Sequence, residues 1–344
     1  MKELQPTDLL VFGYFGFLSN QLDGQTVKTR MIYALLKEKI GDDIKYFDTE
    51  VLKSNIAKIL SAVFKITSAK ILIYIPAQNN INKFFPFLYF LSRIFKFRIF
   101  YFVVGGWLPN FLQGRKLIVV WLRKIDYIFT ETQLMKKELN DKFGISNAVV
   151  FPNFRFRNSF HRDENNTQTI RMVFMSRINK MKGIEMLIDF VKGTKLNVSL
   201  DFFGQVNPDD KEYFLANLRT CDKISYRGVL EPEEIQSILS TYDVLLLPTK
   251  YFTEGLPGAV IDAYFAGIPV IVTRWLHANE FVDHGVTGFI IPFNNGSDEL
   301  EEYIELINSD RNLLHKLKRN SFEFSNRFSS EKAWEILSKR LEVE

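Results

Sequence analysis

Two carboxylates flank a glycine-rich turn in residues 253–271, TEGLPGAVIDAYFAGIPVI. Glu254 precedes the turn, and Asp262 lies in the apolar, helix-like run that follows it. Five residues of helix rise about 7–8 Å, so the two acids could accept hydrogen bonds from separate rings of an extended ligand. Taken singly, Glu254 could be only a partner of the helix dipole and Asp262 an exposed helix residue. The turn itself consists of Gly255, Leu256, Pro257 and Gly258.

A second candidate site lies in residues 175–190, MSRINKMKGIEMLIDF. Arg177 and Lys182 follow a buried strand, just before a helix that opens near Gly183. Two cations beside a helix N-terminus favour a phosphate, because backbone N–H groups and the helix dipole add to their charge. The alternative is that both are solvated surface residues. A ligand with a sugar, a pyrophosphate and a ribose would use this cation pair together with the acid pair.

The elements that must position these residues alternate between strands and helices. Apolar runs without polar alternation indicate parallel sheets that are covered on both faces. A polar segment, 157–169, divides the chain into two such regions. We therefore expect an α/β chain with a domain over 1–156, a linker over 157–169, a domain over 170–325 and a C-terminal helix from 326 that crosses back. The expected strands are 9–16, 44–48, 70–76, 98–106, 126–131, 148–154, 170–177, 195–205, 223–230, 243–249, 268–274 and 287–293.

Composition and charge narrow the classes further. The single cysteine, Cys221, excludes an intramolecular disulfide and suits a reducing compartment. Residues 1–150 contain 21 Lys and Arg against 12 Asp and Glu, and residues 51–125 contain 12 basic residues and no acidic one. This asymmetry predicts an anionic partner for the first half. No signal peptide or spanning segment is evident, so we expect a cytoplasmic protein, peripheral on the inner face of the membrane.

At this point several motifs together resemble one family. The series SRINKMKG, FGQ, YRGVL, EGLPGAVIDAYFAGIPVI and DHGVTGFIIP occurs in the order seen in the retaining glycosyltransferases of family 4. The resemblance covers most of the second half and, more loosely, VVGGWLP and 131–153 in the first. It implies the GT-B fold, in which two Rossmann-like domains with parallel sheets face each other across a cleft.

The resemblance also implies roles for individual residues. Arg177 and Lys182 match the pair that binds the donor pyrophosphate, and Glu254 matches the acid that contacts the transferred sugar. Asp262 matches the acid that binds the ribose hydroxyls, where the family has the longer glutamate. These residues take part in donor binding with Gly255, Leu256, Pro257 and Gly258, with Gly204, Val229 and Leu230 near the base, and with Gly24 in the first loop.

The implied reaction is sugar transfer from a nucleotide-sugar, with a UDP-sugar favoured over a GDP-sugar, and with retention at the anomeric carbon. No Asp-x-Asp motif occurs, so we expect no metal and no cofactor. Relatives carry a histidine near VVGGW, whereas this chain has none in its first 150 residues. On the acceptor side we name Gly106, Trp107 and Asp23, the last as a weak candidate for a base.

The aromatic segment 81–98, INKFFPFLYFLSRIFKFR, suits either a helix buried against the sheet or a surface that enters an anionic membrane. The two could coexist on opposite faces. A lipid-diphosphate-linked glycan acceptor, as used in bacterial surface polysaccharide synthesis, would fit such a surface.

Three alternatives belong to other classes. A non-catalytic nucleotide-sugar-binding or partner subunit is compatible with Asp262 and the missing histidine. A nicotinamide-dependent oxidoreductase is disfavoured, because the first strand leads into GYFGFLSNQLDG without a G-x-G-x-x-G motif. Nucleic-acid binding is disfavoured because the aromatic residues follow core-like patterns, and we expect no nucleic-acid partner.

Overall fold

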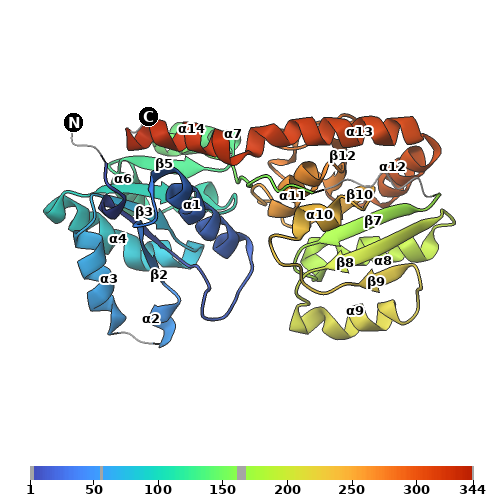
Figure 1. Cartoon of the computed structure of the whole chain (residues 1–344), viewed down its shortest axis with the longest axis horizontal. Coiled ribbons are helices and arrows are strands. Elements are labelled where there is room, and N and C mark those ends of the chain that lie inside the picture. The colour runs from blue at the N-terminus through green and yellow to red at the C-terminus, as the bar shows by residue number, and fades with distance from the viewer. Residues whose placement is uncertain (1–3, 55–56, 161–167, 343–344) are drawn as a thin grey trace. The chain divides into compact units, whose positions relative to one another are not determined.

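The computed structural model describes residues 4–54, 57–160 and 168–342. The chain forms two compact units, Met1–Phe154 with Ser330–Glu344 as unit 1, and Arg155–Ser329 as unit 2 (Figure 1). The expected boundaries, 156 and 325, lie close to these limits. The middle of the expected linker, 161–167, lies outside the described residues.

Unit 1 contains a six-stranded parallel sheet with the order β2-β1-β3-β4-β5-β6. Every residue of β1 and β3 is buried, as continuous apolar strands predict for a sheet covered on both faces. The order places β2 on one side of β1 and β3 on the other. The strands are β1 (Leu9–Gly13), β2 (Lys45–Asp48), β3 (Ile71–Ile75), β4 (Arg98–Phe102), β5 (Tyr127–Thr130) and β6 (Ala148–Val150).

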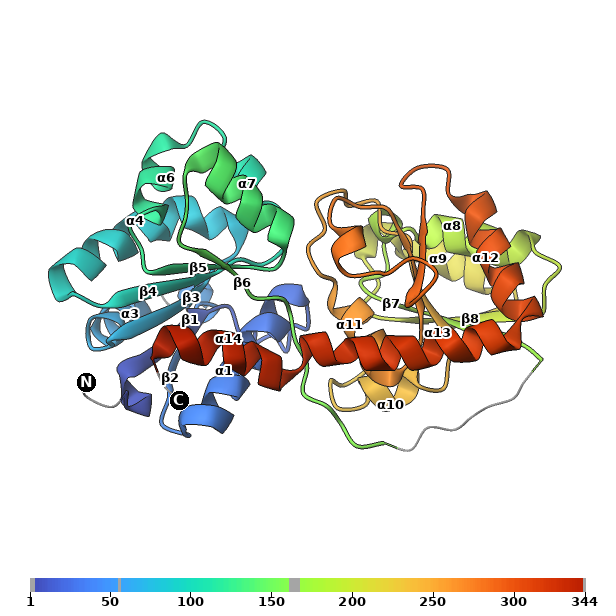
Figure 2. The same cartoon turned by 90° about the horizontal axis from the view of Figure 1, so that it is seen from above.

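Helices cover both faces of this sheet (Figure 2). Helices α3, α4, α5, α6 and α7 share one hydrophobic core with the strands, whereas α1 packs with the C-terminal helix α14. Arg98 of β4 also donates to the carbonyl of Arg340 in α14, at 3.0 Å. The helices are α1 (Gly24–Ile40), α2 (Val51–Ser54), α3 (Lys58–Thr67), α4 (Gln78–Phe95), α5 (Leu108–Leu112), α6 (Lys116–Leu122), α7 (Gln133–Phe143) and α14 (Ser330–Leu341), after a 3₁₀ turn at Pro6–Asp8.

Unit 2 contains a second six-stranded parallel sheet, with the order β12-β11-β10-β7-β8-β9. After β7 the chain adds β8 and β9 on one side and β10 on the other. The point where the strand order reverses therefore lies between β7 and β10, and open α/β sheets bind ligands at the carboxyl ends of the strands there. The strands are β7 (Ile170–Met175), β8 (Val198–Phe203), β9 (Ile224–Tyr226), β10 (Val244–Leu247), β11 (Val270–Thr273) and β12 (Gly288–Ile291).

One continuous hydrophobic core joins this sheet to its helices. Helix α11 packs on β10, α10 and α13, and α8 packs on β8 and α12. The helices are α8 (Ile184–Gly193), α9 (Lys211–Leu218), α10 (Ile235–Leu239), α11 (Gly258–Ala266), α12 (Ser297–Ser309) and α13 (Arg311–Phe324), with 3₁₀ turns η2 (Lys180–Lys182), η3 (Pro208–Asp210), η4 (Ala278–Glu280) and η5 (Ser325–Phe328).

Each expected strand is present, but most end earlier than the apolar pattern indicates, by three or four residues for β1, β4, β6 and β9. For β1 and β4 the structure shows the cause. The segment 9–16 leaves the sheet after Gly13, because the amides of Phe15 and Phe17 donate to the carboxylate of Asp48 instead. The segment 98–106 leaves it after Phe102, where the chain turns through Gly105 at φ 80°. In both cases a buried acid binds the backbone after the strand: Asp48 in the first, and in the second Glu131, which accepts from the amide of Gly105.

Helix α4 has two apolar faces. Its inner face, with Phe85, Leu88 and Tyr89, is buried in the core, whereas Phe84 and Phe95 are exposed. The interpretation of a helix buried against the sheet therefore holds for the inner face, and membrane contact of the outer face stays a prediction. Among the described residues, no helix combines the length and the apolar character that a membrane crossing requires.

Candidate functional site

The two sequence motifs meet where the strand order of unit 2 reverses. Lys182 ends the 3₁₀ turn η2 after β7, and the amide of this residue donates to the side chain of Asn179, at 2.9 Å. Gly183 has φ 83°, and a Cβ there would lie 2.0 Å from the carbonyl oxygen of Pro248. Only glycine therefore lets this turn pack against the end of β10.

Lys182 and Glu254 form an ion pair. The ammonium Nζ of Lys182 donates to Oε2 of Glu254 at 2.5 Å, and the hydroxyl of Thr249 donates to the same oxygen at 3.2 Å. The side chains are 10% and 20% exposed. Lys182 also lies 5.0 Å from the ring centroid of Tyr251, a cation–π contact. The structure thus brings a predicted phosphate-binding cation and a predicted sugar-binding acid into direct contact.

Asp262 lies in α11 and is paired with Arg155. Nε and Nη2 of Arg155 donate to Oδ1 and Oδ2 of Asp262, at 2.6 and 2.9 Å. This bidentate pair is largely buried, with side chains 13% and 5% exposed. Asp262 is therefore not the exposed helix residue of the alternative interpretation. The sequence interpretation omitted Arg155, which carries no signal beyond a cation between two phenylalanines.

Arg177 has a different environment from Lys182. It follows β7, as expected, but its side chain is exposed and forms no ion pair with the residues that the structure describes. Its backbone lies beside Gly204, where φ is 131° and a Cβ would lie 1.9 Å from the carbonyl oxygen of Ser176. The ends of β7 and β8 thus approach each other closely, while the guanidinium of Arg177 lies in solvent.

The remaining predicted donor residues lie on loops of the same unit. The amide of Gly204 donates to the carbonyl of Gly228 at 2.8 Å, which joins the end of β8 to the segment with Val229 and Leu230. Val229 is exposed, and Leu230 packs against the core. Leu256 is buried in that core, whereas Pro257 and Gly258 in the same turn are partly exposed.

In unit 1 the loop after β1 is held by acids. The carboxylate of Asp23 accepts from the amides of Gln25 and Thr26, at 2.9 and 3.0 Å, and so caps α1, which begins at Gly24. Glu50 accepts from the amide of Leu18 at 2.9 Å. Asp23 thus has a structural role, and its role as a base stays a prediction.

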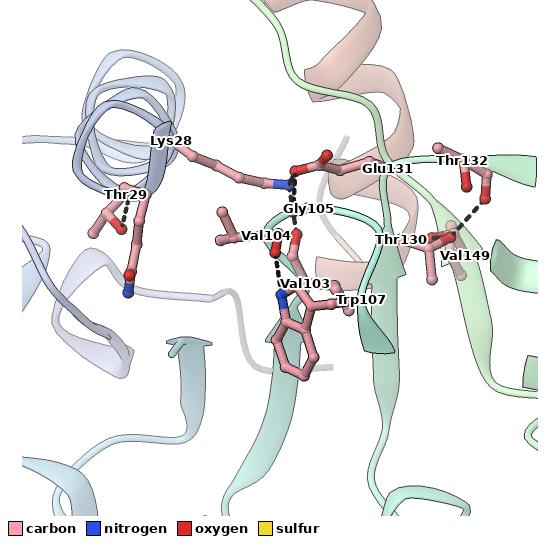
Figure 3. Close-up of polar contacts among 11 residues, drawn as sticks. Lys28, Thr29, Val103, Val104, Gly105, Trp107, Thr130, Glu131, Thr132 and Val149 are labelled. Atoms are coloured by element: carbon pink, nitrogen blue, oxygen red, sulfur yellow. Dashed lines mark hydrogen bonds and ion pairs between the residues drawn. The ribbon is translucent and has the colours of Figure 1, made fainter. Parts of the chain in front are cut away.

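The VVGGW segment is anchored by a buried ion pair (Figure 3). Nζ of Lys28, in α1, donates to Oε1 of Glu131 and to the carbonyl of Val103, each at 2.7 Å. The amide of Gly105 donates to the same Oε1 at 3.1 Å. The indole of Trp107 donates to the carbonyl of Val104 within this turn, and Gly106 is buried beside it.

Both members of this pair are almost inaccessible to solvent, at 3% and 2% exposure. Burial lowers the pKa of Lys28, and the charge and hydrogen bond of Glu131 oppose that shift. The sequence carried a signal for Lys28, which lies on the helix face that Ile32 and Leu35 bury. Glu131 directly follows the apolar strand β5, a position with no comparable signal.

A metal site in a protein requires a cluster of ligand side chains. Within 4–54, 57–160 and 168–342, no three His, Cys, Asp or Glu side chains gather into a group that could hold a metal ion. Metal independence nevertheless stays a prediction.

Comparison with known proteins identifies the second unit. Residues 156–324 match the family model of the glycosyl transferases group 1. An uncharacterized glycosyltransferase of Methanocaldococcus jannaschii is 25% identical over 225 residues, which is 65% of this chain and 62% of the relative. The amylovoran biosynthesis glycosyltransferase AmsK of Erwinia amylovora is 24% identical over 166 residues, 44% of this chain and 39% of the relative. The chain thus matches less than two thirds of either relative.

Among solved structures, the Anabaena protein HepE in complex with UDP and glucose is similar over 97% of this chain and 99% of its own, with a TM-score of 0.77 and 15% identity. This similarity extends through both units and shows the fold. The chain has two parallel α/β sheets, and the group 1 match covers the second of them. Residues 156–324 match the glycosyl transferases group 1, and the chain has the GT-B fold.

Proposed function

We propose that this chain is a retaining, metal-independent glycosyltransferase of family 4, which transfers a sugar from a nucleotide-sugar to a lipid-diphosphate-linked glycan. The observation that carries the proposal is the contact of Lys182 with Glu254 at the reversal point of the unit 2 sheet. Phosphate and sugar hydroxyls of one donor would occupy adjacent positions there. UDP is favoured as the nucleotide, since HepE was solved with UDP and glucose.

In this reaction the bond from the anomeric carbon to the β-phosphate oxygen breaks, and a bond to the acceptor oxygen forms on the same face. The proton of the acceptor hydroxyl passes to the departing phosphate oxygen, so no protein base is required. Lys182 and Arg177 would stabilise the negative charge that grows on that phosphate. Glu254 would accept hydrogen bonds from the transferred sugar and fix its orientation.

A ligand screen tests the proposal. Melting temperatures are measured with UDP, GDP, ADP and their sugars, because a ligand that binds only the folded chain raises stability by mass action. We expect a rise with UDP and UDP-sugars, and slow release of UDP from the matching donor in water. Binding without release of the nucleotide would favour a non-catalytic subunit. The absence of any shift with all these nucleotides would contradict the proposal.

An exposed surface of unit 1 supports the lipid-linked acceptor. Helix α4 packs beside α3 and α6, and all three expose large apolar side chains within the acid-free segment 51–125. Aromatic residues favour the headgroup level of a bilayer, and basic residues favour anionic lipid. We call this the α3–α4–α6 surface. Its exposed apolar residues are Ile59, Leu60, Phe64, Phe84, Phe87, Phe90, Ile94, Phe95, Leu117 and Val120.

Vesicle sedimentation tests this surface. We expect binding to vesicles containing phosphatidylglycerol at low salt, weaker binding at high salt, and little binding to neutral phosphatidylcholine. Replacing Phe87 and Phe90 with glutamate should weaken binding about tenfold or more, because two exposed aromatic anchors are lost and two negative charges are added. Unchanged binding of this variant, or no binding of the wild type at low salt, would contradict the membrane assignment.

A further inference from the structure

We propose that Arg155 is a positioning residue of the donor site, which holds the carboxylate of Asp262 in the orientation that receives the ribose hydroxyls. The inference rests on the proposed function, because it assumes a nucleotide ligand at α11. It adds a residue outside the motifs of the sequence, 107 positions from its partner.

The geometry fixes the plane of the carboxylate. Each carboxylate oxygen of Asp262 receives one N–H of the same guanidinium, at 2.6 and 2.9 Å. Such a two-point contact restricts both position and rotation, which a single ammonium contact does not. An ionised carboxylate has about four acceptor positions, so a bidentate arginine leaves capacity for the two vicinal hydroxyls of a ribose.

The space for the guanidinium is provided by Gly258. A Cβ at this position would lie 2.4 Å from Nη2 of Arg155 and 3.9 Å from Oδ2 of Asp262. Any side chain at 258 would therefore push the guanidinium away from its partner. Gly258 does not have a positive φ, so its backbone conformation does not require a glycine. The guanidinium of Arg155 does, because it occupies the space that a Cβ would fill.

The backbone of Arg155 is anchored to the segment that follows α13. Its amide donates to the carbonyl of Phe328 at 2.9 Å, and residue 155 forms a parallel bridge with Ser329. The guanidinium thus extends from a fixed origin to a fixed acceptor. This anchoring offsets the shortness of Asp262, whose carboxylate lies one methylene closer to its helix than that of a glutamate. The carboxylate of Asp262 is fixed by its helix at one end and by Arg155 at the other, so its oxygens have one orientation.

The test compares a nucleotide with the analogue that lacks both ribose hydroxyls. Calorimetry gives the affinities for UDP and 2′,3′-dideoxy-UDP, and their ratio reports recognition of the hydroxyls. We expect wild type to prefer UDP by about tenfold or more, since hydrogen bonds to a charged group contribute on that order. Arg155→Met should weaken the binding of UDP and so bring the ratio close to one. The affinity for the dideoxy analogue should change by less than about twofold.

Two further variants separate positioning from a general effect on the fold. Gly258→Ala leaves Arg155 in the chain but displaces its guanidinium, so it should reproduce the loss of the ratio. Arg155→Lys keeps the charge without the two-point contact and should restore the ratio only in part. Arg157→Met is the matched control: Arg157 lies over the rings of Phe265 and Phe322 and donates to Ser325, away from Asp262. This control should keep the wild-type ratio.

The outcomes are distinct. A wild-type ratio in both Arg155→Met and Gly258→Ala would overturn the inference and leave a structural ion pair. Tighter binding of UDP to Arg155→Met would also overturn it, because Arg155 would then compete with the ribose. If wild type binds none of UDP, GDP, ADP and their sugars, the proposed function itself fails. If wild type binds UDP but shows no preference over the dideoxy analogue, donor binding stands and the positioning role falls.

Discussion

The two units each contain a lysine–glutamate pair at the carboxyl ends of parallel strands, and the pairs differ in burial. Lys182–Glu254 in unit 2 is partly exposed, at 10% and 20%, on turns that glycine shapes. Lys28–Glu131 in unit 1 is 3% and 2% exposed and binds two backbone groups of the VVGGW segment. The same two functional groups thus suit ligand exchange in one place and backbone anchoring in the other.

The two lysine–glutamate pairs also differ in the free-energy cost of separating their charges. Water reaches part of the Lys182–Glu254 pair, so separating its two charges costs less free energy than in a fully buried pair. A fully buried pair cannot be separated without leaving a charge in a poorly solvated environment. We therefore propose that the pair in unit 2 serves the substrate, whereas the pair in unit 1 fixes the conformation of a loop.

The largest effect is expected at the exposed pair. Lys182→Ala should abolish the melting shift with UDP and reduce turnover by about 10²–10³-fold, the loss typical of one preorganised charge donor. Glu254→Gln should keep the nucleotide shift but lose turnover, because it alters the sugar contact and retains the cation. Melting shifts and UDP release measure the two effects. Undiminished turnover in both variants and in Arg177→Ala would refute the assignment of the site.

At the buried pair we expect a change in stability rather than in donor binding. Lys28→Met should reduce the free energy of unfolding by about 3–5 kcal/mol, because Glu131 remains buried without its partner. The double variant Lys28→Met, Glu131→Leu should recover most of this loss. Urea unfolding measures both, and hydrogen exchange of the Gly105 amide reports the anchoring of the loop.

The double variant also tests whether nucleotide binding depends on the buried pair of unit 1. Its nucleotide shift should equal that of wild type, because the pair lies in unit 1, whereas the group 1 match and the predicted donor-binding charges of Arg177, Lys182, Glu254 and Asp262 lie in 156–324. A single Lys28→Met variant as stable as wild type would show that the buried pair is not a stabilising anchor. A lost nucleotide shift in a well-folded double variant would contradict the division of roles between the units.

The fold was predictable because its signals are local. Continuous apolar runs such as 71–75 identify buried strands, and the spacing of Ile32, Leu35 and Leu36 identifies an inward helix face. Strand ends were less predictable, since the acids that redirect the chain lie far along the sequence: Asp48 is 35 positions from Gly13, and Glu131 is 29 from Phe102. Local periodicity carries no information on such distant partners.

The candidate site was predictable in its motifs and not in its pairings. The motif around Lys182 and the motif around Glu254 each predict the start of a helix. The parallel topology brings the two side chains together. Arg155 has no motif, and its partner is distant in the sequence. Its role depends on a gap beside Gly258 that only coordinates show. Arg177 matched a motif, yet its exposed side chain has no ionic partner among the described residues.

The smallest effect is expected at a third, more exposed arrangement in unit 2. Glu185, in the first turn of α8, is paired with Lys250 at 2.9 Å and with Lys180 at 3.1 Å. The hydrogen bond from Lys250, aided by that from Lys180 and by both charges, lowers the pKa of Glu185 below its ordinary value of 4.5. Its stabilisation is therefore fully present above about pH 4.5 and is lost as the pH falls through the lowered folded-state pKa.

Glu185→Gln should thus reduce the free energy of unfolding at pH 7 by less than about 1 kcal/mol, because the side chain is partly solvated. The difference from wild type should shrink as the pH falls below 4.5. Urea unfolding of both proteins across this range measures it, and Lys250→Met should show part of the same dependence. A difference that stays constant with pH would mean that packing, not charge, accounts for the effect. A difference larger than that of Lys28→Met would reverse the link between burial and energy on which the contrast of the two lysine–glutamate pairs depends.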